Sequence, residues 1–343
     1  MKLTSGINLG GYLSQCVHTP EHYRQFITEN DIKQIAEWGF DHIRLPIDYE
    51  VLENEDGTVR ASGYLYVDKV IEWCAAYHLN IILDLHKAYG YDFNNAGSAE
   101  KNNLFSNINL QNRFINLWTV IAERYAKCPH VAMELLNEVV EEENAEAWNR
   151  LIAKAVNKIR EIAKETPIIY GGICWNSAKT LKYLDVPESE NIIFTFHFYE
   201  PLLFTHQKAP WVAGVDKAKD IFYPETMDYF RKQSAALGIQ GGAVTDATTE
   251  KMGPVFIAEM VEEAVKAAKN AGVPLYCGEF GVIDRAPVKD TLQWFTDVKE
   301  VFRKHNIGCA VWTYKEKDFG LTDSHYDEIR EDLVALLTNH ENK

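Results

Sequence analysis

Short apolar runs recur along the chain, and most of them are followed by a segment with the periodicity of an amphipathic helix. The runs begin near Ser5, His42, Asn80, Val131, Pro167, Ile192, Pro274 and Ile307. Apolar residues recur at positions i, i+3, i+4 and i+7 in residues 31–39, 66–78, 111–127, 145–164 and 291–305. Alternation of strands with helices predicts parallel strands, because each return along the chain is made by a crossover helix.

Eight such strand–helix units predict a (β/α)8 barrel. An open, doubly wound sheet is the main alternative, but it usually has a glycine-rich phosphate loop after its first strand. The segment at that position reads NLGGYLSQ and matches neither GxGxxG nor a Walker motif. The pattern therefore favours the barrel.

One step between successive runs is much longer than the others, with 82 residues between Ile192 and Pro274. The excess lies in residues 200–254, after the carboxyl end of the sixth strand, which is the face where barrel enzymes carry their chemistry. A segment of this size is too small to form an independent core. We therefore expect one catalytic domain, residues 1–343, in which residues 200–254 form a lid or a wall of the active-site cleft.

The composition is that of an ordinary globular protein, with 46% hydrophobic and 25% charged residues. A formal net charge of −15 opposes binding to nucleic acids or to anionic membrane surfaces, so neither is an expected partner. No apolar run approaches the length of a membrane-spanning helix. The six cysteines are scattered singly, and we expect small buried side chains in place of disulfides or metal ligands.

The first residues, MKLTSGINLGGYLSQ, have no continuous apolar stretch and no cleavage site typical of a signal peptide. Three interpretations are left open: the protein is cytoplasmic, it is exported by another route, or a leader has been removed from this chain.

Polar and titratable residues collect where the predicted strands end. A purely structural barrel would place Val or Leu at most of these positions, because an unpaired buried charge costs several kcal/mol. The residues concerned are Arg44, Asp48, Asp84, His86, Lys87, Asn137, Glu138, His197, Tyr199, Glu279, Trp312 and Tyr314. The predicted mouth of the barrel is therefore a candidate active site.

Glu138 and Glu279 follow the apolar runs of the fourth and seventh strands, within MELLNE and LYCGEF. Two carboxyl groups facing each other across a barrel mouth are what a glycosidase needs, since one donates a proton while the other attacks the anomeric carbon. The structural alternative is that each carboxylate is an ion-pair partner, for example of Arg44. The His, Tyr, Asn and Trp residues at neighbouring strand ends favour catalysis.

Aromatic residues near the strand ends suit a sugar substrate, because flat rings stack on the apolar faces of pyranoses. The candidates are Trp175, Tyr199, Trp211, Trp312 and Tyr314. The other tryptophans lie in helical patterns and are expected to pack helices against the barrel. These are Trp38, Trp73, Trp118, Trp148 and Trp294.

A metal site is the competing chemistry, because Asp84 and His86 alternate on one strand and His197 or Glu138 could complete a ligand set. Asp84, however, lies inside the apolar run IILDLH, so we expect it to orient a neighbouring residue or to pair in the barrel interior. We therefore expect no metal.

The segments GFDHIRLPID, IILDLHK, ELLNE, FTFHFYEP, YCGEFG and AVWTYK, in this order, resemble glycoside hydrolase family 5. The family contains (β/α)8 endoglucanases and mannanases, and this chain looks most like its bacterial endo-β-1,4-glucanases with an insertion after strand six. The resemblance implies that Glu138 is the acid/base and Glu279 the nucleophile of a retaining mechanism, with no metal or organic cofactor.

The resemblance also implies supporting roles for six further residues. Asn137 would bind the sugar 2-hydroxyl, Arg44 would keep Glu279 ionised, and Tyr199 would donate to Glu279. His197 would flank the acid/base, His86 would bind sugar in subsite −1, and Trp312 would form the floor of that subsite. One departure is visible, because many family members have two histidines after strand three and here the pair is His86 and Lys87. Lys87 is thus a subsite candidate at which sugar recognition is expected to differ from the family pattern. Trp211 is a further subsite candidate.

We expect a monomeric retaining endo-β-1,4-glucanase acting on β-linked polysaccharides or oligosaccharides. The alternatives are a β-mannanase, a mixed-linkage or β-1,3-glucanase on the same machinery, and an inactive carbohydrate-binding barrel, which would not need both glutamates. A lyase or aldolase would need a Schiff-base lysine, for which Lys87 and Lys315 are candidates, and a phosphate-binding loop, which is missing.

Overall fold

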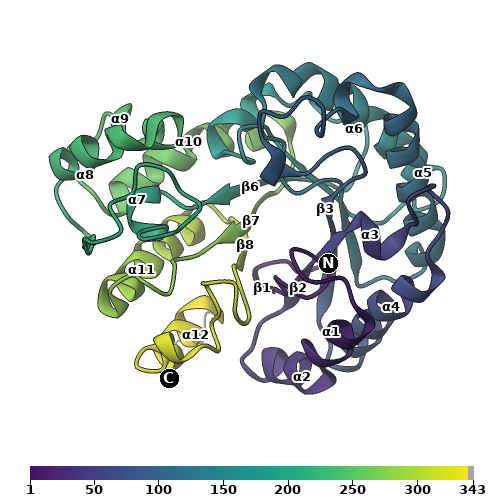
Figure 1. Cartoon of the computed structure of the whole chain (residues 1–343), viewed down its shortest axis with the longest axis horizontal. Coiled ribbons are helices and arrows are strands. Elements are labelled where there is room, and N and C mark those ends of the chain that lie inside the picture. The colour runs from purple at the N-terminus through teal and green to yellow at the C-terminus, as the bar shows by residue number, and fades with distance from the viewer. Residues whose placement is uncertain (339–343) are drawn as a thin grey trace.

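The computed structural model describes residues 1–338, and its centre is a closed barrel of parallel strands in chain order (Figure 1). The first and last strands pair directly, through Gly6 with Ala310, and this pairing closes the barrel. The strands are β1 (Ser5–Asn8), β2 (His42–Asp48), β3 (Asn80–Lys87), β4 (Val131–Glu134), β5 (Ile168–Gly171), β6 (Ile192–Phe198), β7 (Leu275–Phe280) and β8 (Gly308–Val311). The predicted (β/α)8 barrel is confirmed.

Helices surround the strands. They are α1 (Pro20–Gln25), α2 (Glu29–Glu37), α3 (Tyr49–Leu52), α4 (Ala61–Ala76), α5 (Ile108–Tyr125), α6 (Ala145–Arg160), α7 (Leu202–Thr205), α8 (Met227–Ser234), α9 (Gly242–Thr245), α10 (Pro254–Ala271), α11 (Val288–Lys304) and α12 (Arg330–Thr338). Short 3-10 helices are η1 (Phe93–Asn95), η2 (Leu104–Ser106), η3 (Glu142–Asn144), η4 (Ala178–Tyr183), η5 (Ala235–Gly241) and η6 (Ser324–Tyr326). The five predicted helices correspond to α2, α4, α5, α6 and α11.

The helix boundaries follow from local chemistry. In α6 the buried residues recur with helical spacing, from Trp148 through Leu151 and Ile152 to Ile159, so one face packs on the barrel. Pro254 occupies the first turn of α10, where its missing N–H has no intrahelical partner to lose. Gly272 ends the same helix with φ of 68°, a left-handed conformation that a glycine adopts without a Cβ clash.

The core has two layers. A small cluster fills the inside of the barrel, made of Ile82, Ala132, Ile169, Tyr276 and Ala310. The larger cluster lies between the strands and the helices, and three of the predicted packing tryptophans are buried there. Their indole N–H groups donate to carbonyl oxygens near strand ends: Trp118 to Leu135, Trp148 to Gly171 and Trp294 to Glu200. Trp38 and Trp73 are half-buried against the same core.

Residues 199–253 separate β6 from α10 and contain α7, α8, η5 and α9. In Figure 1 this segment lies beside α10 and α11, at one side of the barrel. Its first part approaches the carboxyl ends of the strands, because the His206 ring packs edge-on against Tyr199 with the ring centres 4.9 Å apart. The long step in the sequence is therefore an addition after β6.

All six cysteines are free thiols, and Cys74, Cys277 and Cys309 are buried, as predicted for small apolar side chains. Among the described helices, none combines the length and the apolar character needed to cross a membrane.

Candidate active site

Glu279 points into the barrel mouth because β7 carries a bulge. Phe196 of β6 pairs with Cys277, but the next residue, His197, pairs with Glu279, so Gly278 is an extra residue in β7. Cys277 and Phe280 both pack outward in the layer between strands and helices. Strict alternation from Cys277 would also turn Glu279 outward. The bulge at Gly278 resets the alternation and aims the carboxylate inward.

Glu138 lies in the loop after β4. The strand ends at Glu134, so the expectation that Asn137 and Glu138 lie at its last positions is wrong by three to four residues. Two main-chain hydrogen bonds fix the loop on the neighbouring strands, from Leu135 N to Ile169 O and from Asn137 N to Leu85 O. The loop follows the strand direction beyond the sheet and holds Glu138 over the barrel mouth.

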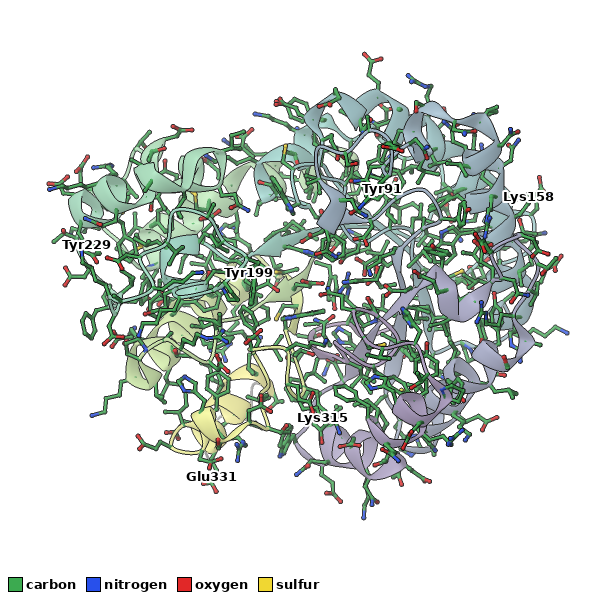
Figure 2. The ribbon with its side chains drawn as sticks, in the orientation of Figure 1. Tyr91, Lys158, Tyr199, Tyr229, Lys315 and Glu331 are labelled. Carbon is green, nitrogen blue, oxygen red and sulfur yellow. The ribbon has the colours of Figure 1, made fainter. Side chains whose placement is uncertain are left out.

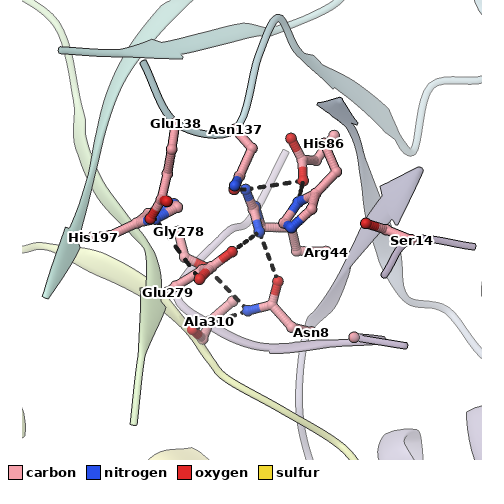
Figure 3. A network of polar contacts seen from close by, with 12 residues as sticks. Asn8, Ser14, Arg44, His86, Asn137, Glu138, His197, Gly278, Glu279 and Ala310 are labelled. Carbon is pink, nitrogen blue, oxygen red and sulfur yellow. Dashed lines mark hydrogen bonds and ion pairs between the residues drawn. The ribbon is translucent and has the colours of Figure 1, made fainter. Parts of the chain in front are cut away.

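Arg44 is the centre of the polar network that Figure 3 shows. Its guanidinium is fully buried and donates from Nη1 to Glu279 Oε1 at 2.8 Å and to Asn8 Oδ1 at 3.0 Å. Nη2 donates to Asn137 Oδ1 at 2.9 Å. Nε also donates to Glu134 Oε2 at 2.8 Å, and Nη2 donates to Glu134 Oε1 at 2.9 Å. The predicted pairing of Arg44 with Glu279 is present, and the same cation orients Asn137.

Sequence analysis missed Glu134 and Asn8, and it gave Asp84 two possible roles, orienting a neighbour or pairing in the barrel interior. Glu134 and Asp84 are completely buried beside Arg44, which lies 3.0 Å from Asp84. Burial raises the pKa of Asp84 to about 7 and also raises the pKa of Glu134. A carboxylate in the apolar run MELLNE was a usable signal for Glu134, whereas nothing local singles out Asn8.

The two catalytic candidates face each other, and one carboxylate oxygen of each lies within 4.8 Å of the other. His197 Nδ1 is 2.8 Å from Glu138 Oε1 and 3.7 Å from Glu279 Oε2. Burial raises the pKa of Glu138 to about 7, which favours a bound proton at neutral pH. Glu279 accepts hydrogen bonds from Arg44 and, at 3.0 Å, from the Tyr199 hydroxyl. The surroundings therefore suit Glu138 to donate a proton and Glu279 to attack as a carboxylate.

His86 and Trp312 form one stacked pair in the mouth, with ring centres 5.9 Å apart and ring planes 6° from parallel. Asp84 Oδ2 lies 2.6 Å from His86 Nδ1, so this aspartate orients the imidazole, as expected. The amide nitrogen of Gln15 lies 3.0 Å from His86 Nε2, a contact that sequence analysis missed. A flat ring beside an oriented imidazole suits the expected sugar subsite.

Lys87 lies in an ion pair. Its ammonium is 3.4 Å from Asp48 and 3.5 Å from Asp92, and 15% of the side chain is exposed. The positive charge of Lys87, at the position where the resemblance suggested a second histidine, is therefore shared between two carboxylates.

The aromatic candidates differ in how far their rings are exposed to a ligand. Trp211 is 54% exposed, and Trp175 is half-buried beside the loop that carries Glu138, where the main-chain N–H of Trp175 donates to Val139 O. Tyr314 is buried, and its hydroxyl donates to Asp31 of α2 at 3.1 Å. The prediction that Tyr314 stacks on sugar is wrong, because its ring packs between the barrel and a helix. Figure 2 shows Tyr199 in the middle of the molecule, away from Tyr229 at the rim.

Two groups of side chains among the described residues are close enough to share a cation. One is Glu138, His197 and Glu279 themselves. The other is His18, Asp48 and Glu50. The Lys87 ammonium beside Asp48 opposes a cation in the second group. The set considered from the sequence, with Asp84 and His86 as joint ligands, is not formed, because Asp84 hydrogen-bonds His86 directly.

Comparisons with known proteins agree with this geometry. The cellulase family, glycosyl hydrolase family 5, matches residues 5–318. Cellodextrinase A of Ruminococcus flavefaciens is 40% identical over 91% of this chain and 87% of its own length. Endoglucanase C of Acetivibrio thermocellus is 37% identical over 97% of each chain. Endoglucanase Cel5A of Thermotoga maritima, solved with cellobiose and with mannotriose, is 25% identical over 98% of this chain and 97% of its own, with a TM-score of 0.74.

The family match covers residues 5–318, which include all eight strands of the barrel, and the two relatives align over 91% and 97% of this chain. A closed barrel, two opposed glutamates and a buried arginine beside one of them accord with that match. The chain is a glycoside hydrolase and belongs to glycosyl hydrolase family 5, the cellulase family.

Proposed function

We propose that this protein is an endo-β-1,4-glucanase that retains the configuration of the anomeric carbon, with Glu138 as acid/base and Glu279 as nucleophile. The observation that carries the proposal is that the two carboxyl groups face each other, with one oxygen of Glu138 within 4.8 Å of one oxygen of Glu279. Inverting enzymes separate their carboxyl groups by about 6.5–9.5 Å to admit a water, whereas retaining enzymes place them about 5–5.5 Å apart.

In the first step, Glu279 attacks the anomeric carbon while Glu138 donates its proton to the glycosidic oxygen. The carbon–oxygen bond breaks, the shortened chain leaves as an alcohol, and the sugar is bound covalently to Glu279. In the second step, the Glu138 carboxylate takes a proton from water, the water oxygen attacks the same carbon, and Glu279 is released. Two inversions give net retention.

Supporting side chains have matching orientations. Asn137 Oδ1 accepts from Arg44, which fixes the amide and leaves its NH2 group to donate to the sugar 2-hydroxyl. Arg44 and Tyr199 hold Glu279 in place for attack. Trp312 offers its face as the floor of subsite −1, and His86 stacks on that ring. No residue in this scheme requires a metal or an organic cofactor.

The whole chain acts as one catalytic domain in this proposal, and residues 200–254 form a wall of the cleft. The contact between His206 and Tyr199 supports this placement, because Tyr199 itself reaches Glu279. We expect the enzyme to work as a monomer on a soluble β-glucan chain.

A hydrolysis panel tests the substrate. We expect reducing ends from carboxymethyl cellulose and lichenan, with little from β-1,3-glucan. A β-mannanase is the second candidate, because the Thermotoga relative was solved with mannotriose as well as with cellobiose. Faster release from mannan than from either glucan would replace the first assignment with the second. No hydrolysis of any polymer, with tight binding retained, would indicate a carbohydrate-binding barrel.

A further inference from the structure

Two buried polar atoms behind the acid/base have no hydrogen-bonding partner among the described residues. They are His197 Nε2 and Thr195 Oγ1. The two residues alternate on β6, so their side chains share the face that looks into the barrel. Burying a polar atom without a partner costs roughly 1–3 kcal/mol, so a pair of such atoms in one place calls for a physical explanation.

The bulge residue Gly278 faces both atoms. A Cβ placed on Gly278 would lie 3.1 Å from His197 Nε2 and 3.1 Å from Thr195 Oγ1. The two atoms therefore border the same small space, which the glycine keeps free of a side chain. Gly278 is held there by its carbonyl, which accepts from Asn8 Nδ2 at 3.0 Å.

The other side of His197 determines which ring nitrogen must carry the proton. Its Nδ1 is 2.8 Å from Glu138 Oε1, whereas Glu138 Oε2 has no hydrogen bond to any residue the structure describes. A general acid must carry its proton on the oxygen that faces the substrate, which leaves Oε1 as an acceptor. Burial lowers the pKa of His197 to about 4, so the imidazole is neutral and has a single N–H. That N–H belongs on Nδ1, and Nε2 then needs a donor.

We propose that one buried water lies beside Gly278, bonds to Thr195 Oγ1 and donates to His197 Nε2, and so holds His197 in its Nδ1–H form. Thr195 and Gly278 are then positioning residues for the acid/base Glu138. This inference rests on the retaining mechanism proposed above. A site with two polar partners meets the usual minimum for an ordered buried water.

The same tautomer serves both half-reactions. Before proton donation, Nδ1–H donates to the carbonyl-type oxygen of neutral Glu138 and leaves the acidic proton on Oε2. After donation, the same N–H meets a carboxylate, and the bond becomes charge-assisted and stronger. The contact therefore favours proton departure without moving a proton through His197. In the opposite tautomer, Nδ1 would accept the Glu138 proton and withhold it from the leaving group.

Thr195→Val tests the proposal, with Thr195→Ser as the matched control that keeps the hydroxyl. The measured quantity is kcat/KM on cellotetraose, whose leaving group needs protonation, and on 2,4-dinitrophenyl cellobioside, whose leaving group does not. Thr195→Val should lose about tenfold on cellotetraose, a part of the roughly 100- to 10,000-fold that general acid catalysis contributes. It should lose less than about twofold on the dinitrophenyl substrate, and Thr195→Ser should keep kcat/KM on cellotetraose close to the wild-type value. A purely structural defect would lower both values together.

Three results would overturn the inference. The first is a Thr195→Val enzyme whose two kcat/KM values stay at the wild-type level or fall in the same proportion. The second is a wild-type protein in which ¹⁵N NMR shows His197 protonated at Nε2. The third is a high-resolution crystal structure without a water between His197 Nε2 and Thr195 Oγ1. Wild-type enzyme that hydrolyses neither substrate would instead refute the proposed function.

Discussion

Glu138 and Glu279 are the same type of residue in opposite surroundings. Glu279 accepts from Arg44 and Tyr199, while Glu138 contacts a neutral imidazole and no cation. Pairs of carboxyl groups whose environments differ in this way divide into an acid and a nucleophile. The roles follow from the neighbours of each glutamate and should not be interchangeable.

Substitution of each glutamate separates these roles. Glu279→Ala should abolish turnover, and added azide should restore it with an α-azide product, because azide attacks in place of the carboxylate. Glu138→Ala should instead give the β-azide, since azide then attacks the glycosyl–enzyme. Product anomers are read by NMR. The exposed Glu142 is a matched control, and Glu142→Ala should keep full activity. If both active-site variants lose less than about tenfold in kcat/KM, roughly 1.4 kcal/mol, the assignment is wrong.

The titration of Glu138 should be visible in the pH dependence of activity and in that of stability. With its pKa raised to about 7, the acid form is lost as the pH rises through 7, so kcat/KM should fall there. A carboxyl group whose folded-state pKa is raised loses stability as the pH rises from its unfolded value through its folded value. At pH 8, Glu138→Gln should therefore have a free energy of unfolding higher than that of wild type by on the order of 1–3 kcal/mol, and a higher melting temperature. At pH 4 neither quantity should rise.

Glu200 is the matched control for this effect. Burial raises its pKa to about 7 as well, but its carboxylate accepts from Leu202 N, outside the catalytic pair. Glu200→Gln should gain stability at pH 8 in the same way and keep the pH profile of kcat/KM. Equal pH profiles for wild type and for the residual activity of Glu138→Gln would assign the titration to another group.

Among the elements, β7 has the most specific task. Its bulge turns Glu279 inward while Phe280 stays against Trp294 of α11. The segment between β6 and α10 adds a second feature at this edge of the barrel. It brings His206 to Tyr199 and leaves Trp211 more than half exposed, at 54%. An exposed tryptophan next to His206, with ring centres 6.4 Å apart, suits a sugar-binding platform in the proposed wall.

Replacing Trp211 tests this segment as a wall of the cleft. Trp211→Ala should raise KM on long glucans, leave kcat unchanged, and keep the melting temperature within a few degrees, because the contact is made equally in ground and transition states. Ile239, which is 90% exposed in η5 of the same segment, is the control, and Ile239→Ala should change neither value. If Trp211 were instead packed against the rim, its loss would cost about 3–5 kcal/mol of stability with KM unchanged.

At the scale of the whole molecule, the barrel fixes the distance between loops far apart in sequence. β4 and β7 lie on different sides of the closed sheet, and Arg44 from β2 spans the space between them through Glu134 and Glu279. The separation of the two candidate carboxyl groups, Glu138 and Glu279, is therefore a property of barrel closure.

The stereochemistry of the product reports this separation. Proton NMR at early times of hydrolysis should show the β-anomer first, followed by slow mutarotation to the α-anomer. Carboxyl groups this close leave no room for an attacking water on the opposite face, so initial inversion is not expected. Initial formation of the α-anomer would make the enzyme inverting and contradict the proposed mechanism.

The sequence by itself determined the barrel and named most of the side chains that meet at its mouth. Periodicity of apolar residues is a local property, so each strand and the helices α2, α4, α5, α6 and α11 were readable without their neighbours, whereas the long helix α10 was not among the predicted segments. Glu138 and Glu279 were identifiable because carboxylates seldom end apolar runs without a function. The packing roles of Trp118, Trp148 and Trp294 followed from helical spacing in the same way.

Tertiary structure alone decided how these pieces meet. The bulge at Gly278 is a register shift between strands, and the five acceptors around Arg44 come from four different strand regions. Tyr314 was misplaced because its partner, Asp31, lies 283 residues away. Contacts of this kind depend on strand pairing and barrel closure, and no local pattern encodes the distance between residues that only the folded chain brings together.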